Sequence, residues 1–141
     1  MEYQNDKPKL TRIETPGNYG VRVCKIRDDD VSTTQAGAPK IKVLLVTKDG
    51  QKITETFFGS TDGALRRVAA FVGVACQQKG LGLPPRDSDG LRSYLDKAAG
   101  KWLKVDVIQE EVTFSSGEKK MLCKVTKYHP LVEIKDSAPP F

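Results

Sequence analysis

The chain has 141 residues, of which 38% are hydrophobic and 29% are charged, and its formal net charge is +5. This size and composition are typical of one folded domain with short tails, and they exclude a disordered or collagen-like chain. No apolar stretch approaches the roughly 18 residues that a membrane span requires, and residues 1–10 lack the apolar region of a secretory signal. We therefore expect a cytoplasmic protein whose mild positive charge permits a polyanionic partner.

Cysteine and histidine are too few and too scattered for the common catalytic and metal sites. Cys24, Cys76 and Cys123 form no CxxC pair, and we expect them to be reduced thiols in the core. The lone His129 argues against a Ser-His-Asp triad or a histidine-centred metal site. The chain also lacks the GxxxxGKS, GxGxxG and GxSxG motifs. We therefore expect no enzymatic activity, no metal and no cofactor.

Three strands are predicted in the first half of the chain, because apolar and polar residues alternate there. Their expected ranges are 19–26, 41–46 and 52–58. The intervening residues 28–40 show no periodicity and are rich in Asp, Thr, Gly and Pro, which predicts a long loop. The Asp49-Gly50 pair predicts a tight turn between the second and third strands.

Helical spacing replaces this alternation after residue 60. Leu65, Val68 and Val72 recur on one helix face behind N-cap candidates at 60–62, and Gly80 is the expected end of the helix. A second short helix and two further strands are expected over residues 88–99, 102–108 and 119–128.

This element order predicts a mainly β fold, a five-stranded OB-fold barrel with one or two helices inserted between strands three and four. An α+β sheet with helices on one face uses the same ingredients and is the alternative. We expect residues 1–16 to form a flexible N-terminal arm, 17–132 the OB-fold domain and 133–141 a flexible C-terminal tail. A small barrel with exposed edge strands can also form a homodimer.

The outward faces of the last two strands are the most informative surface. Alternation predicts that rings and ammonium groups interleave there, at Trp102, Lys104, Lys124 and Tyr128. Single-stranded nucleic acid is bound by this combination, since bases stack on rings and phosphates pair with cations. The alternative for Trp102 is packing under a helix, as most tryptophans are largely buried.

Two loops border the ligand groove of an OB-fold, and here they are residues 28–40 and 110–119. They contribute Lys40, with Lys42 just inside the next strand, and Phe114 and Lys119. Phe114 sits in a Ser/Gly turn with little core to join, although it can also pack in a small cluster with Val112. The acidic run 28–30 and Glu110-Glu111 would repel phosphate near the same rim.

The segment order resembles that of small bacteriophage proteins of the DUF669 type, which look like OB-fold single-stranded-DNA-binding proteins of phage recombination and replication modules. The resemblance covers roughly residues 15–131. It is carried by the opening strand 17–21, the turn 48–50, Phe57-Phe58, and the segments 100–105 and 124–130.

The C-terminal residues are similar to the tip of bacterial single-stranded-DNA-binding proteins, an acidic tail that closes on Pro-Phe and recruits replication and repair proteins. Here Pro140 and Phe141 match the closing residues, and Asp136 stands where acidic residues would. The chain departs from that pattern by having only Glu133 and Asp136 as acids, with Lys135 between them. A frayed terminus is the alternative.

We therefore expect a single-stranded-DNA-binding protein of a phage or prophage. The residues expected to stack on bases or pair with phosphates are Arg22, Lys40, Lys42, Trp102, Lys104, Phe114, Lys119, Lys124, Lys127 and Tyr128. Asp136, Pro140 and Phe141 are the expected partner-binding tail. The alternatives are a phage adaptor or inhibitor that holds a host protein, and a metal-dependent nuclease that uses the acids 28–30.

Overall fold

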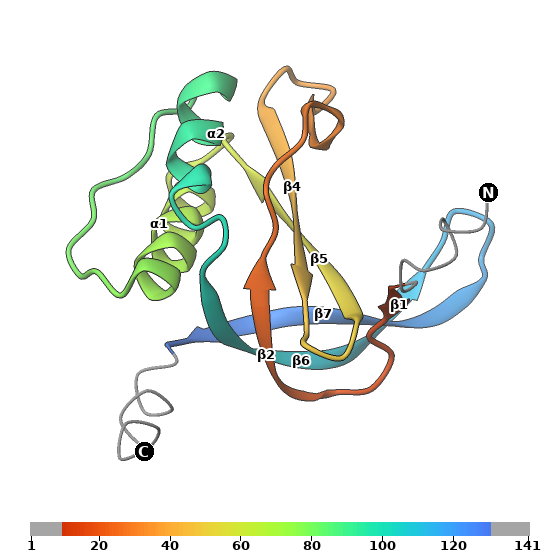
Figure 1. The fold of residues 1–141 in the computed structure, drawn as a ribbon. Coiled ribbons are helices and arrows are strands. Elements are labelled where there is room, and N and C mark those ends of the chain that lie inside the picture. The colour runs from red at the N-terminus through yellow and green to blue at the C-terminus, as the bar shows by residue number, and fades with distance from the viewer. Residues whose placement is uncertain (1–9, 131–141) are drawn as a thin grey trace, which may run out of the picture.

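The computed structural model describes residues 10–130, in which seven strands form one strongly curled sheet and two α-helices pack beside it (Figure 1). The strands are β1 Thr11–Arg12, β2 Gly17–Val23, β3 Val31–Thr33, β4 Pro39–Val46, β5 Gln51–Phe58, β6 Trp102–Thr113 and β7 Lys119–His129. The helices are α1 Asp62–Cys76 and α2 Ser88–Asp96, both between β5 and β6. The expected mainly β class is confirmed, as is the insertion of helices in the middle of the chain.

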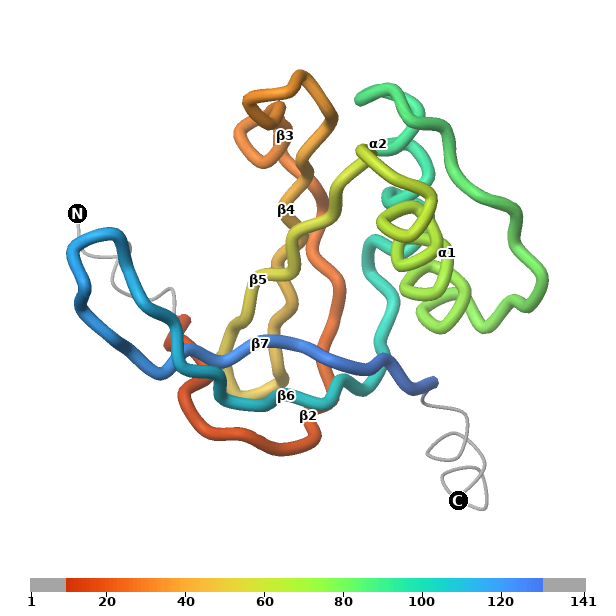
Figure 2. Tube along the Cα trace, turned by 180° about the vertical axis from the view of Figure 1, so that it is seen from behind, coloured from red at the N-terminus to blue at the C-terminus, as the bar shows by residue number. Residues whose placement is uncertain are grey.

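The sheet runs in the order β1-β5-β4-β2-β6-β7, with β3 paired to β4. All pairs are antiparallel except β1 with β5. The sheet curls until β5 and β7 come into contact, but no ladder of backbone hydrogen bonds between these two strands is found in residues 10–130 (Figure 2). The result is a half-barrel with one open seam.

The alternation of apolar and polar residues explains which side chains of the long strands point into the core. Ile41, Val43 and Leu45 of β4 are fully buried, while the residues between them are more exposed. Gly50 closes the predicted Asp-Gly turn with φ = +89°, a conformation that glycine adopts at no steric cost. These features confirm the sequence prediction for this hairpin.

The helices begin where the sequence predicts, but α1 ends early. Thr61 caps α1 by accepting a hydrogen bond from the backbone N–H of Ala64 at 3.0 Å, and Asp87 caps α2 in the same way. We expected α1 to end at Gly80, and this was wrong, because the left-handed residue that ends it is Gln77, with φ = +57°. Side chains of α1 from Leu65 to Ala75 complete the core against the sheet.

The sheet includes residues that precede the expected domain boundary at residue 17. Ile13 is only 1% exposed, and its N–H donates to the carbonyl of Lys52 at 2.9 Å. Thr11 pairs with Gln51 in the short parallel strand β1. Residues 11–13 of the expected flexible arm are therefore bonded to β5, and β1 itself has only two residues, too few to leave a periodic pattern in the sequence.

The long loop before β4 also has structure. It contains the 3₁₀ turn Asp28–Asp30 and the strand β3. The Asp28 carboxylate accepts a hydrogen bond from Arg92 at 2.8 Å, and Asp30 accepts one from the N–H of Arg27 at 2.9 Å. Two of the three acids thus fasten the loop to α2 and to itself.

Candidate nucleic-acid interface

The outward side of β2, β4 and β5 carries a strip of cations. Residues opposite each other in paired strands share a face, and the buried residues of each strand identify its inward face. The charged side chains at the described outward positions of these three strands are Arg22, Lys40, Lys42 and Lys52, and none of those positions is acidic. We call these four residues the cation strip.

Phe58 adds an aromatic ring to one end of the cation strip, because it lies opposite Lys40 and is only partly buried. We expected Arg22, Lys40 and Lys42 to bind phosphate, and the structure brings them together with Lys52. Lys52 and Phe58 were missed as site residues. The alternation of β5, with Ile53 and Phe57 inward, would have identified both.

Trp102 and Lys104 continue this outward face onto β6. Trp102 lies opposite Arg22, and Lys104 lies opposite Gly20. The indole of Trp102 is partly exposed, with the Lys48 ammonium 5.9 Å from its centroid. Trp102 therefore occupies an outward position on the sheet, where one side of its ring meets a cation.

The outward face of the β6–β7 pair is mixed in charge. Asp106 accepts one hydrogen bond from Asn18 at 2.8 Å and pairs with His129 at 2.9 Å, and Lys127 lies opposite it. These hydrogen bonds, that from His129 first, lower the pKa of Asp106. Lys124 pairs with Glu110 at 3.1 Å. Lys124 and Lys127 on these two strands thus lie next to carboxylates, whereas the outward positions that the structure describes on β2, β4 and β5 carry no acid.

Tyr128 faces the core side, and the expectation that it points outward was wrong. It lies opposite the buried Val105, whereas Val125 lies opposite the buried Val107. The three-residue spacing between two inward residues arises from an irregularity in the ladder at Asp106/Val107, which places an extra residue, Thr126, in β7. Such a bulge shifts every later side chain to the opposite face.

Inside the seam, Tyr128 joins β7 to β5 and α1. Its hydroxyl donates to the Glu55 carboxylate at 2.6 Å and accepts from Arg67 Nε at 3.1 Å. Arg67 also donates to Glu55 at 2.6 Å, and the Tyr128 ring packs edge-on against Phe71 with centroids 5.3 Å apart. Burial, and then the charge of Glu55, raise the pKa of Tyr128 well above its ordinary value. This network closes the half-barrel with side chains.

The β6–β7 hairpin extends beyond the body of the sheet (Figures 1 and 2). Phe114 lies at its tip, 37% exposed, with the Lys120 ammonium 5.7 Å from its ring centroid. Lys119 is exposed where β7 begins. Phe114 and Lys119 are thus displaced from the cation strip along the hairpin.

No cluster of three or more His, Cys, Asp or Glu side chains that could hold a metal ion occurs in residues 10–130. Neither helix in that part of the chain is long and apolar enough to cross a membrane. The three cysteines are free thiols and are partly buried. The expected tail residues Asp136, Pro140 and Phe141 lie outside the described residues.

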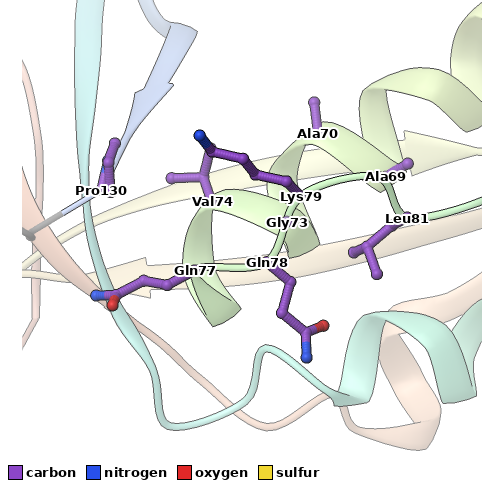
Figure 3. Close-up of a pocket in the computed structure, with 10 residues that line it drawn as sticks. Ala69, Ala70, Gly73, Val74, Gln77, Gln78, Lys79, Leu81 and Pro130 are labelled. Atoms are coloured by element: carbon purple, nitrogen blue, oxygen red, sulfur yellow. The ribbon is translucent and has the colours of Figure 1, made fainter.

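Two hollows of residues 10–130 differ in place: one borders this surface, and the other lies away from the cation strip. The larger has a volume of about 980 Å³ and is lined by Gly20, Lys48 and Trp102, together with residues at the end of α1. The smaller, about 480 Å³, lies on the outer side of α1 (Figure 3). Its lining is mostly apolar: Ala69, Ala70 and Gly73 of α1 contribute small residues, and Leu81 and Pro130 flank them.

Comparison with known protein families and with curated proteins found no match to this chain.

Proposed function

We propose that this chain binds single-stranded DNA on the outer face of an open OB-type barrel. The strand order supports the fold assignment, since β5-β4-β2-β6-β7 is the order of a five-stranded OB barrel with helices between its third and fourth strands. The contact between β5 and β7 stands where such a barrel would close. β1 and β3 are then short additions to this plan.

The observation that carries the proposal is the cation strip. Four cations on three adjacent strands, with no acid at the outward positions of those strands, form a positive track on the face where OB-folds bind oligonucleotides. Phosphate neutralisation supplies most of the affinity in sequence-independent binding. Trp102 and Phe58 supply rings beside the track, and base–aromatic stacking contributes about 1–3 kcal/mol per base.

A role in a phage replication or recombination module is proposed from the resemblance of the segment order to DUF669-type phage proteins alone. In such a role the protein would coat exposed strands and pass them to partner proteins.

Salt dependence tests the proposal. The four cations of the strip predict a slope of log K against log salt of about −3, from about −0.7 per neutralised phosphate on a single strand. Replacing Lys42 by Ala should weaken binding of labelled oligodeoxythymidine and make the slope shallower by about 0.7. Fluorescence anisotropy over a series of salt concentrations measures both quantities.

The matched control is Lys79→Ala, which removes a cation beside the hollow on α1, away from the strip. It should leave affinity and slope unchanged. Binding that is insensitive to salt, or equal loss in both variants, would count against the cation strip as the DNA track.

A second candidate function, capture of a host protein as an adaptor or inhibitor, is favoured by the apolar hollow on α1. A partner would place an apolar side chain over Ala70 and Val74. Ala70→Glu would put a carboxylate into this hollow, so it should abolish partner binding while leaving oligodeoxythymidine binding intact. Pull-down with wild type and with the variant distinguishes this function from DNA binding.

A further inference from the structure

Gly20 leaves a gap in the outward face of β2, beside the Trp102 ring. Arg22 lies opposite Trp102 and Gly20 lies opposite Lys104, so Gly20 is the diagonal neighbour of Trp102 on that face. From the other side, the turn after β4 brings in Lys48, whose Nζ lies 5.9 Å from the Trp102 centroid. All three line the same cavity, and we call Gly20, Lys48 and Trp102 the Gly20 notch.

Neither the backbone nor the packing of residues 10–130 demands a glycine at position 20. Its φ is outside the left-handed region, and a Cβ built on it would meet no atom within 4 Å. Glycine weakens the interior of a strand, and in strands it often marks a place where a ligand approaches closely. The missing side chain therefore keeps space open next to an aromatic ring.

The cavity is large enough for a nucleotide, and its lining carries more cations than acids. Its volume of about 980 Å³ is at the upper end of small-molecule sites, which are roughly 300–1,000 Å³. Lys48 and Lys101 line it, while Asp49 is the one acid among its described lining residues. The Thr47 hydroxyl donates a hydrogen bond to Asp49, which ties that carboxylate into the turn.

We propose that the Gly20 notch receives one base of the bound strand, which stacks on Trp102 while Lys48 leaves the ring and pairs with the adjacent phosphate. This inference rests on the proposed function. An exposed cation–π contact is worth roughly two- to fivefold in an equilibrium constant, whereas stacking of one base is worth roughly five- to 150-fold. A base therefore displaces the ammonium with a net gain.

The single tryptophan of the chain makes the notch directly observable. Oligodeoxythymidine should quench Trp102 fluorescence, because the base stacks on the indole. An abasic phosphodiester of the same length keeps the charges and lacks the bases, so it should bind more weakly and leave the emission nearly unchanged. Anisotropy of the labelled oligomer measures total binding independently of Trp102.

Gly20→Val fills the notch with a side chain that strands favour. It should weaken oligodeoxythymidine binding by roughly five- to 150-fold, the worth of one stacked base, and abolish the quenching. The matched control is Gly82→Val, at another glycine with open space beside it and an ordinary backbone. If Gly20→Val does not fold, as judged by circular dichroism, Trp102→Leu takes its place and is read by anisotropy alone.

The outcomes separate this inference from the proposed function. Quenching by the oligomer that is lost in Gly20→Val and kept in Gly82→Val supports the notch. Salt-sensitive binding that neither quenches Trp102 nor responds to Gly20→Val or Trp102→Leu overturns the notch and leaves the DNA-binding proposal standing. Quenching by the abasic phosphodiester equal to that by the oligomer also overturns it. Absence of any oligomer binding by anisotropy overturns both.

Discussion

A buried carboxylate with two partners governs the seam at the scale of single residues. Glu55 is 6% exposed, and a carboxylate at that depth is tolerated only when it is paired and hydrogen-bonded. Tyr128 and Arg67 supply those bonds at 2.6 Å each. The side chains of Glu55, Arg67 and Tyr128 are hydrogen-bonded to one another, so we assign this network the role of closing the half-barrel.

Removing the Tyr128 hydroxyl should destabilise the fold in a pH-dependent way. Tyr128→Phe takes one hydrogen bond from a buried carboxylate, at a cost of about 1–2 kcal/mol in the free energy of unfolding at neutral pH. The folded-state pKa of Tyr128 lies above the unfolded value of about 10. The stability that this phenol contributes is therefore complete below about pH 10 and is lost as pH rises through the folded pKa.

Urea denaturation of both proteins across alkaline pH measures this difference. The gap between wild type and Tyr128→Phe should narrow above about pH 10. A gap that stays constant would show that the phenol is not the titrating group. Near-ultraviolet absorbance of tyrosinate gives a second reading, since one late ionisation should disappear in the variant.

At the scale of elements, α2 depends on a close approach at its first turn. A Cβ at Gly90 would lie 2.7 Å from Cβ of Pro85 and 2.9 Å from Oδ1 of Asp87, the residue that caps the helix. At Gly63, in the first turn of α1, the nearest atom is the Thr61 hydroxyl at 3.9 Å. Packing therefore requires a glycine at the start of α2 but not at the start of α1.

Alanine substitutions at these two glycines should act in opposite directions. Gly90→Ala overpacks Pro85 and should lower the free energy of unfolding by about 1–3 kcal/mol, more than helix propensity returns. Gly63→Ala meets no clash and should raise it by about 0.4–1 kcal/mol. Thermal unfolding monitored by circular dichroism checks both. If Gly90→Ala instead raises the free energy of unfolding, the segment that contains Pro85 can move aside without cost, and the clash does not occur.

At the scale of the whole molecule, the half-barrel is held by backbone ladders except at one place. β2 lies at the centre of the sheet, flanked by β4 and β6, whereas β7 has a ladder only on its β6 side among the described residues. Across the seam, side chains of Glu55, Arg67 and Tyr128 take the place of a ladder. Local opening is therefore expected first at β7, whose backbone is hydrogen-bonded to a described strand on one side only.

Native-state hydrogen exchange should follow this layout. Amides of Val21 and Val23 in β2 should exchange slowest, near the free energy of global unfolding, and those of β7 faster. Arg67→Ala leaves Glu55 with Tyr128 alone, so it should raise exchange in β7 more than in β2. Uniform exchange across β2 and β7 would mean that the seam does not open separately.

Local rules determined much of this protein from its sequence alone. Period-two alternation assigned the inward and outward residues of β4 and of the first half of β6. The Asp-Gly pair placed the β4–β5 turn, and Thr61 placed the start of α1. Those assignments depend on neighbours within a few residues, so no tertiary information was needed. The same rule put Lys42 outward, where the structure has it. Lys40 was expected in the preceding loop, and it lies outward near the start of β4.

Only the tertiary structure decided how these faces combine. The bulge at Thr126 turned Tyr128 inward, because a single extra residue reverses the alternation, and Tyr128 then lies opposite Val105 and bonds to Glu55. Residues 73 apart in sequence meet at the seam, and Gly20 becomes a notch only because Trp102 and Lys48 come from two other segments. Contacts of this kind depend on how strands pair across the sheet, which the local pattern of residues does not encode.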